Sequence, residues 1–419
     1  MPTRQTEVPP AAADRWRVGL VTNVGRVDDG TFNQYAYEGM QRAAAELGLE
    51  TTYIETTRPE DGEGNILMLI HDDCQLVITV GQQLGEIVER LAKEYPDTYF
   101  LTIDFAPYPP LPNVMGALFA EDEAGFLAGA LAGLMTRSRV VAVVAGDQVP
   151  AVIKFRKGFT NGARLVNPRV RVLGEYIESF TDPGKGRAMA ESFMRQGADV
   201  IFGAGGLTGS GAIRAAAEQG AWVIGVDQDE WNTTFEGGRA PGSDRLLTSA
   251  IKRVDNAAYL AVRSFAEGTF EGKNVIFDTG NAGIGLAPYH ASEAAIPEAV
   301  KGRLDELRVA LRSGTLRTGV GPRGEDMAET FWRRLRAWNW TELAVLGLAV
   351  VTAVLIGAII IWVTRVSDLR GAGQSWADSI AAANNVVLLA YGGLFEGALG
   401  SPQALTTSLV YALPYVLAG

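Results

Sequence analysis

Residues 198–211 read ADVIFGAGGLTGSG, an apolar run that breaks into glycines. The β-branched start predicts a buried parallel strand, and a helical pattern follows from Ala212. Glycines at such a turn let the backbone approach a ligand and direct free N–H groups at it. The next predicted strand ends at Asp227. Because ligands of open α/β sheets bind at the carboxyl ends of strands, these two strands predict a site that combines a glycine turn with carboxylates.

Composition restricts the class of protein. The 419 residues are enough for two or three domains, and the hydrophobic share of 47% is that of a folded chain. A net charge of −11 argues against nucleic acid as a partner. Cys74, His71 and His290 do not have the spacing of metal ligands, and a structural role is the better interpretation for each.

Predicted strands alternate with helical patterns in two successive sets. This alternation indicates right-handed βαβ crossovers and parallel sheets, and two smaller sheets are favoured over one long one. We therefore expect two doubly wound α/β lobes with the ligand site in the cleft between them. The first set of strands is 18–22, 51–54, 76–80, 98–103 and 114–119, and the second is 140–144, 170–173, 200–202, 223–226 and 246–249.

The chain is expected to cross from the first lobe to the second near Thr136 and to return between Thr248 and Asp255. A predicted helix and strand after the return would complete the first lobe. The predicted parts are a disordered lead at 1–15, a binding domain at 16–311 (lobe 1, 16–136 and 253–290; lobe 2, 137–252) and a linker at 312–330.

The C-terminal part changes character. Residues 343–363 carry no charge and are long enough as a helix to cross a bilayer core of about 30 Å, so a transmembrane helix is predicted at 341–364. Tryptophans lie at both of its ends, as interfacial anchors do. The remainder, 365–419, is expected to be a loop and the truncated start of a second membrane segment. Residues 1–10 contain no apolar stretch of the kind found in secretory signals, so no such signal is predicted.

Two loops that lead into helices carry a phenylalanine each. Residues 28–34 read DDGTFNQ, and residues 178–186 read ESFTDPGKG. Phe32 and Phe180 could hold a flat heterocycle between them as the lobes close, and Asn33 offers both a donor and an acceptor. The plainer interpretation of each loop is a capped helix with a packed apolar residue.

The glycine turn also allows an enzyme. Its pattern is close to a dinucleotide fingerprint, with Asp227 near the distance expected for a ribose contact. The spacing is off by one residue, and the turn lies in the middle of the chain, so a nicotinamide-dependent enzyme is only a remote alternative. The sequence contains neither a P-loop motif nor a plausible Ser-His-Asp arrangement.

Five separated motifs occur in order along the chain: VDDGTFNQYAYEG at 27–39, EDEAGFLAG at 121–129, SFTDPGKG at 179–186, GGLTG at 205–209 and GVDQD at 225–229. Together they resemble the basic membrane protein family, the nucleoside-binding proteins of ABC importers. The resemblance implies a type I periplasmic-binding-protein fold that closes about a hinge, a nucleoside as ligand, no cofactor and no enzymatic activity.

The resemblance also implies roles for single residues. The two phenylalanines would stack on a purine, while Asp227, Asp229 and Lys252 would hold the ribose hydroxyls. At position 23 the family commonly has an aspartate, and Asn23 predicts a base preference shifted toward inosine or a broader set. The predicted ligand contacts are Asn23, Asp28, Phe32, Asn33, Phe180, Gly205, Gly206, Asp227, Asp229 and Lys252.

The C-terminal part resembles the start of the permease that partners such binding proteins. This implies an ABC ATPase subunit and a second permease as partners, and the lipid bilayer as surroundings. A capture domain belongs outside the cytoplasm, yet the arginines before the predicted span favour a cytoplasmic N-terminal side. A misplaced start codon, translocation by the span itself, or a cytoplasmic nucleoside sensor would each resolve this conflict, and the outward capture domain is favoured.

Overall fold

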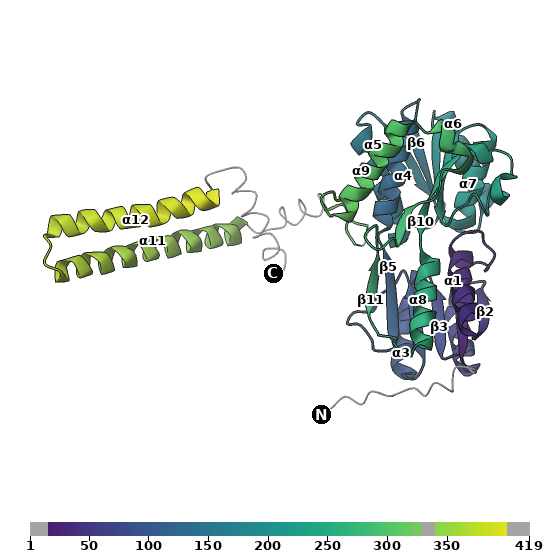
Figure 1. Ribbon diagram of the computed structural model, residues 1–419, viewed down its shortest axis with the longest axis horizontal. Coiled ribbons are helices and arrows are strands. Elements are labelled where there is room, and N and C mark those ends of the chain that lie inside the picture. Colours follow the sequence, from purple (N-terminus) through teal and green to yellow (C-terminus); the bar gives the residue numbers. More distant parts are fainter. Residues whose placement is uncertain (1–15, 323, 328–339, 400–419) are drawn as a thin grey trace. The chain divides into compact units, whose positions relative to one another are not determined.

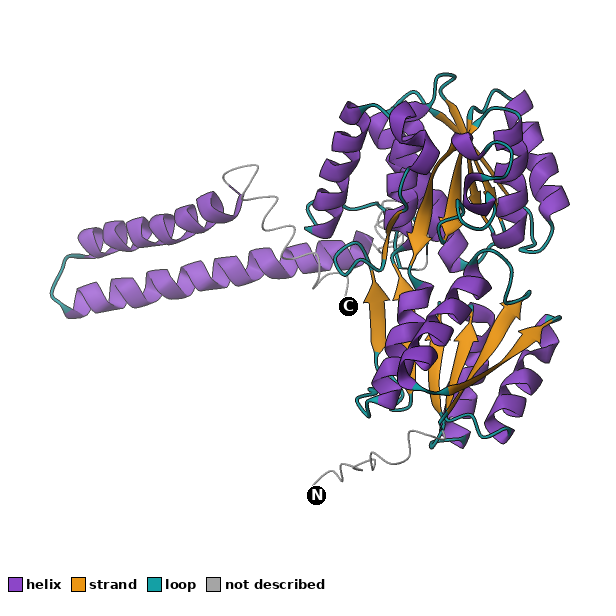
Figure 2. Ribbon diagram, turned by 45° about the vertical axis from the view of Figure 1, so that its right-hand side comes forward, coloured by secondary structure: helices purple, strands orange, loops and turns teal. Residues whose placement is uncertain are grey.

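The computed structural model describes residues 16–322, 324–327 and 340–399. The chain divides into two compact units, residues 1–329 and 330–419. The first unit contains two sheets of six strands, each covered by helices (Figures 1 and 2). The prediction of two α/β lobes with parallel sheets is confirmed. The predicted lead at 1–15 lies outside the described residues.

The first sheet is parallel throughout and has the order β11-β5-β4-β3-β1-β2. The second has the order β12-β10-β9-β8-β6-β7 and is parallel except for β12, which runs antiparallel to β10. The strands are β1 Arg17–Val24, β2 Glu50–Thr56, β3 Leu76–Val80, β4 Tyr99–Ile103, β5 Val114–Phe119, β6 Val140–Ala145, β7 Arg171–Tyr176, β8 Val200–Ala204, β9 Trp222–Asp227, β10 Leu246–Lys252, β11 Asn274–Phe277 and β12 Ile284–Leu286.

Helices lie on both faces of each sheet. The helices of this unit are α1 Phe32–Leu47, α2 Gly62–His71, α3 Gly85–Glu94, α4 Glu121–Met135, α5 Pro150–Val166, α6 Pro183–Arg195, α7 Gly206–Glu218, α8 Val254–Ala266 and α9 Glu298–Arg312. Short 3₁₀ turns are η2 Pro59–Asp61, η3 Gln82–Leu84, η4 Glu236–Gly238, η5 Ser243–Arg245 and η6 His290–Ala295.

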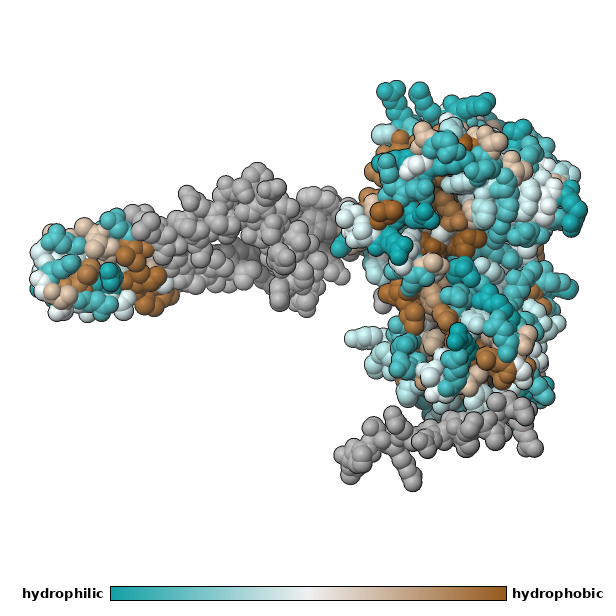
Figure 3. Space-filling view, in the orientation of Figure 1, coloured by the Kyte–Doolittle hydropathy of each residue, from teal (hydrophilic) through white to brown (hydrophobic). Residues whose placement is uncertain are grey.

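Successive residues of a strand point to opposite cores, which explains why the strands are continuously apolar. On β6, Val141 and Val143 belong to the core that includes α4 and α5. Ala142 and Val144 belong to the core that includes α6 and α7. Hydrophilic residues cover most of the face of the two lobes seen in Figure 3, and hydrophobic residues reach that surface in separate patches.

The first crossing between lobes differs from the predicted position near Thr136. Helix α4, placed in lobe 1 by the sequence, packs along α5 of the second lobe. Its glycines make this close packing possible: a Cβ added to Gly129 would lie 2.0 Å from the carbonyl oxygen of Phe159. The chain therefore crosses at Ala120, between β5 and α4.

Two further crossings follow. The chain returns between β10 and α8, and α8 packs against α1 while β11 pairs with β5. It then crosses again between β11 and β12, since β12 pairs with β10. The sequence placed residues 253–290 in lobe 1. Strand β12 has only three residues, too few for a recognisable pattern.

The described part of the predicted linker packs on the second lobe. Asn161 Nδ2 donates to the carbonyl of Thr318 at 2.8 Å, and the Thr318 hydroxyl donates to Asp122. Val320 and Asp326 form an isolated antiparallel bridge. Thr318 is therefore attached to α4 and α5 by specific hydrogen bonds.

The second unit contains two helices that pack on each other, α11 Trp340–Gly371 and α12 Trp376–Leu399. The span predicted at 341–364 lies within α11, which continues through the charged residues Arg365, Asp368 and Arg370. Among the helices of the described ranges, none is both long enough and apolar enough to cross a membrane. The predicted span is thus not found there, and residues 400–419 lie outside the described part of the chain.

Candidate functional site

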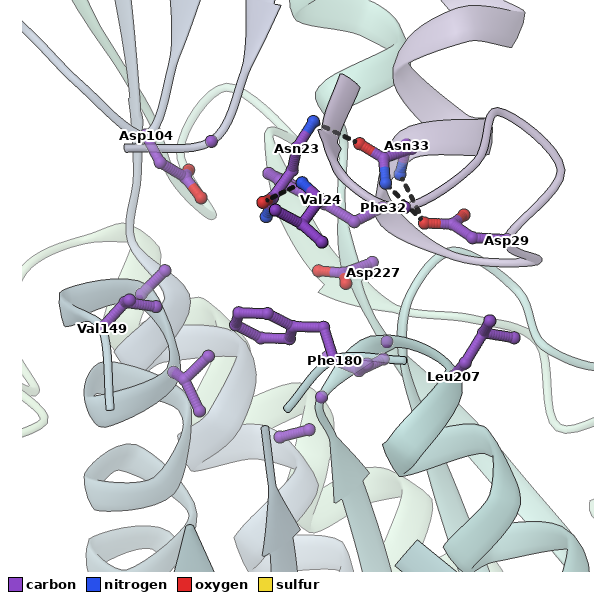
Figure 4. A pocket seen from close by; sticks show the side chains of 18 of the residues that line it. Asn23, Val24, Asp29, Phe32, Asn33, Asp104, Val149, Phe180, Leu207 and Asp227 are labelled. Atoms are coloured by element: carbon purple, nitrogen blue, oxygen red, sulfur yellow. Dashed lines mark hydrogen bonds between the residues drawn. The ribbon is translucent and has the colours of Figure 1, made fainter. Parts of the chain in front are cut away.

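A cavity lies between the two lobes, at the carboxyl ends of strands from both sheets. Strands β1, β3 and β4 contribute residues of the first lobe, and β8, β9 and β10 contribute residues of the second. This is where the topology of parallel sheets predicts a ligand site. Figure 4 shows first-lobe residues on one side, second-lobe residues on the other, and Asp227 between them.

Eight of the ten predicted ligand contacts line this one cavity. They are Asn23, Phe32, Asn33, Phe180, Gly205, Gly206, Asp227 and Lys252. The structure thus brings together residues that are more than two hundred positions apart in the sequence.

Asp28 and Asp229, the other two predicted contacts, are not among the residues that line this cavity. Asp28 is exposed and paired with Arg26, whose Nε lies 2.7 Å from Oδ1. Its neighbour Asp29 turns inward and lines the cavity instead. Asp229 lies in hydrogen-bond contact with His290, 2.7 Å from Nε2.

Phe32 and Phe180 come from opposite lobes and line the same cavity. The ring of Phe180 packs on the backbone at Gly146, where an added Cβ would lie 2.6 Å from two ring carbons. The ring of Phe32 lies beneath the ammonium of Lys252, whose nitrogen is 4.9 Å from the ring centroid. Two aromatic faces on separate lobes suit a flat ligand that enters an open cleft.

The glycine turn brings backbone close to backbone. A Cβ on Gly205 would lie 2.4 Å from the amide nitrogen of Gly146, so any side chain there would push β6 and β8 apart. Gly206 has a φ of +56° and begins α7, and both Gly206 and Leu207 line the cavity. Thr208 N donates to the carbonyl of Phe180 at 3.2 Å, so the turn also fixes the phenylalanine loop.

Asn33 is fixed by two hydrogen bonds within the first lobe. Its Oδ1 accepts from the backbone N–H of Asn23 at 3.0 Å, and its Nδ2 donates to Asp29 at 3.0 Å. Asp29 also accepts the backbone N–H groups of Asn33 and Gln34, which caps α1. Burial raises the pKa of Asp29 above its usual value. The hydrogen-bonded side chain of Asn33 therefore holds the end of β1, at Asn23, in position.

Sequence reasoning missed the buried ion pairs beneath the cavity. The ammonium of Lys252 lies 2.6 Å from Asp104 Oδ1 and 2.9 Å from Glu121 Oε1. Glu121 is also paired with Lys154. Asp104 directly follows β4, the position at a strand end that made Asp227 a candidate, so the same argument could have found it. Glu121 and Lys154 lie on helices and gave no comparable signal.

The electrostatics of the cavity follow from burial. Burial raises the pKa of Asp227 to about 7, although Lys252 opposes the shift. It also raises the pKa of Asp104. Burial alone would lower the pKa of Lys252, but Asp104, Glu121 and Asp227 together hold it above its ordinary value. Asp104 and Asp227 both have positive φ angles, 68° and 66°, a strained conformation that is common at binding sites.

Two hydrogen bonds join the lobes beside the cavity. Gln228 Nε2 donates to the carbonyl of Thr31 at 3.3 Å, and the Thr233 hydroxyl donates to the carbonyl of Gly30 at 2.8 Å. The loop after β9 is thereby held against the loop before α1. These contacts connect the two lobes in the arrangement seen here.

Comparison with known proteins gives the family. Residues 17–307 match the family described as ABC transporter substrate-binding protein PnrA-like. The chain belongs to this PnrA-like family. The family is one of substrate-binding proteins of transporters and not of enzymes, which disfavours the nicotinamide alternative. The predicted periplasmic-binding-protein type I architecture agrees with this assignment.

Individual relatives of this PnrA-like chain cover most of the first unit. It is 29% identical to a CD4+ T-cell-stimulating antigen of Listeria monocytogenes, over 73% of this chain and 88% of that protein. It is 27% identical to the ABC transporter nucleoside-binding protein BmpA of Lactococcus lactis, over 69% of this chain and 86% of that protein. A solved ABC transporter solute-binding protein of Aeropyrum pernix has a TM-score of 0.65 and 26% identity, over 72% and 92% of the two chains.

Proposed function

We propose that the chain binds a nucleoside, most favourably a purine nucleoside, in the cavity between its lobes, as the capture component of an ABC importer. The observation that carries the proposal is that Phe32 and Phe180, from opposite lobes, line one cavity together with Asp227 and Lys252. The family and the nucleoside-binding relative of Lactococcus lactis support it.

Each part of the ligand has a group of matching chemistry. The base would lie between the two phenylalanine rings, where stacking is tolerant of base identity. The ribose hydroxyls would donate to the carboxylate of Asp227 and accept from the ammonium of Lys252. A site that buries such polar groups rejects a bare base, because the groups would then be left unpaired.

A thermal-shift screen of the full-length chain tests this proposal. The panel contains purine and pyrimidine nucleosides, free bases, sugars and NAD. A rise in Tm with nucleosides, and a smaller one with bases or sugars, is the expected result. A chain that NAD or a sugar stabilises, and that no nucleoside stabilises, would not be a nucleoside-binding protein.

We propose further that the binding domain acts outside the cytoplasm. Relatives are named basic membrane protein D in Borreliella burgdorferi and an uncharacterized lipoprotein in Pyrococcus abyssi. An ABC ATPase subunit and permease partners follow from the proposed importer role, and the fusion to a permease remains a prediction from the sequence. Digestion of the domain by protease added to intact cells is expected. Protection in cells, with digestion in inside-out vesicles, would instead support a cytoplasmic sensor.

A further inference from the structure

Glu121 occupies an unusual position between the lobes. It is the first residue of α4 and directly follows the crossing from β5 at Ala120. Its side chain is 2% exposed and forms ion pairs with Lys252 and Lys154. Lys252 is itself the last residue of β10, where the chain crosses back. The Glu121–Lys252 pair therefore joins two of the crossings about which the lobes would move.

Lys252 connects this hinge to the cavity. Its ammonium has three N–H donors, and Asp104 and Glu121 are acceptors within 2.9 Å. The same nitrogen lies 4.9 Å from the ring centroid of Phe32 and 5.0 Å from that of Phe119. Two carboxylates and two rings thus confine the end of a long flexible side chain that lines the cavity.

We propose that Glu121 is a positioning residue for the ligand-binding site: it holds the Lys252 ammonium on the second lobe, at the place where Asp104 of the first lobe and the ligand meet it when the lobes are closed. The inference rests on the proposed binding role of the cavity. A side chain that becomes ordered only on binding loses conformational entropy, and this loss weakens binding. Because the Lys252 ammonium is fixed before the ligand arrives, that loss is avoided. Helix α4 and strand β10 both belong to the second lobe, so Glu121 and Lys252 move together. A change of hinge angle would instead separate the ammonium from Asp104 of the first lobe and weaken the site.

Charge balance determines the design of the test. Asp104, Glu121, Lys154 and Lys252 together carry two negative and two positive charges. Glu121→Gln alone leaves one buried positive charge in excess and is expected to reduce stability. The Lys154→Met/Glu121→Gln double variant restores the balance. The Lys154→Met single variant is the matched control. It lacks the same lysine, and therefore the same hydrogen bond to the carbonyl of Phe119, but keeps Glu121.

Two properties of the full-length chain are compared between the double variant and Lys154→Met. The first is the rate at which acetic anhydride labels Lys252, followed by mass spectrometry. Lys252 is 1% exposed, so its labelling rate reports how tightly the side chain is confined, and this measurement needs no ligand. The second is the Kd for a purine nucleoside. In the double variant we expect labelling about tenfold faster and a Kd higher by about 10- to 100-fold, the effect of one hydrogen bond to a charged group.

Each outcome decides one proposal. Unchanged labelling overturns the positioning role, and so does faster labelling with an unchanged Kd. If the unaltered chain binds no nucleoside, the proposed function fails, while the labelling rates still decide whether Glu121 confines Lys252. Circular dichroism of both variants confirms that the comparison is made between folded proteins.

Discussion

Lys252 and Asp104 form an ion pair between the two lobes. The lysine ends β10 of the second sheet and the aspartate follows β4 of the first, yet Nζ lies 2.6 Å from Oδ1. Both side chains are almost fully buried. Removing either partner of such a pair would leave the other as an uncompensated buried charge. Asp227 lines the same cavity without an ion pair of its own among the described residues. Its pKa is raised to about 7, so its charge changes with pH near neutrality.

Asp227→Asn is expected to remove part of the pH dependence of stability. Burial raises the pKa of Asp227 from 3.8 to about 7, so the folded chain holds a proton that the unfolded chain has lost between these values. Its stabilising contribution is complete below about pH 4 and is lost as the pH rises through about 7. At pH 8 the variant should melt roughly 2–5 °C above the parent chain, and the difference should shrink toward pH 4.

Scanning calorimetry between pH 4 and 8 measures this difference. Burial also raises the pKa of Glu230 to about 7, but that residue is present in both proteins and cancels in the comparison. A variant that melts below the parent chain at pH 8 would show that ionised Asp227 is stabilising.

Nucleoside affinity should have the opposite pH trend. An ionised Asp227 accepts hydrogen bonds from both ribose hydroxyls, whereas the protonated form accepts less well. Affinity is expected to rise between pH 6 and 8 in the parent chain and to be lower and nearly constant in Asp227→Asn. Titration calorimetry at several pH values gives both curves, and parallel curves would exclude this residue as the titrating group.

Phe180→Ala is expected to weaken nucleoside binding by about 1–3 kcal/mol, the usual effect of losing one aromatic stacking partner. Phe180→Leu retains apolar bulk without the ring and should weaken binding as well. Tyr108→Ala is a matched control, because Tyr108 is 90% exposed and is not among the lining residues of the cavity. Equal affinities of the leucine variant and the parent chain would argue that the ring contributes bulk and not stacking.

Thr233→Val removes the hydroxyl that donates to the carbonyl of Gly30 in the other lobe. Loss of one such bond is expected to weaken binding about 2- to 10-fold, mainly through faster release. Thr269→Val is the control, since the Thr269 hydroxyl bonds within one lobe, to the carbonyl of Ser264. Stopped-flow displacement compares the release rates, and identical rates would mean that this bond does not keep the lobes closed.

Asn23→Asp is expected to change base preference. Asn23 Oδ1 accepts from the backbone N–H of Val24 at 2.5 Å, so the amide nitrogen is the group left to donate to a ligand. A donor favours an acceptor on the base edge, such as the 6-oxo group of inosine, and aspartate lacks this donor. The ratio of inosine to adenosine affinity should therefore fall in the variant. An unaltered ratio would remove Asn23 from the determinants of specificity.

Local patterns predicted the strands well because both faces of each sheet are buried. Continuous runs such as 76–80 and 114–119 match β3 and β5 residue for residue. The topology then placed Asp227 and Gly205 correctly at one edge, since parallel strands end on the same side.

What sequence reasoning missed depends on packing over long distances. Helix α4 belongs with the second lobe because glycines such as Gly129 meet the backbone of α5, which no local pattern reveals. Adjacent carboxylates could not be told apart either. Asp28 turns outward to Arg26 and Asp29 turns inward to cap α1. The Lys252–Glu121 pair joins residues more than a hundred positions apart.

Titration calorimetry of the full-length chain with inosine, hypoxanthine and ribose tests most directly whether the two rings and the buried polar groups recognise one nucleoside together. We predict one inosine bound per chain, at least about 100-fold more tightly than either fragment, because stacking and hydroxyl contacts are then made in the same cavity. Binding of ribose or hypoxanthine as tight as that of inosine, or no binding of inosine, would contradict this account.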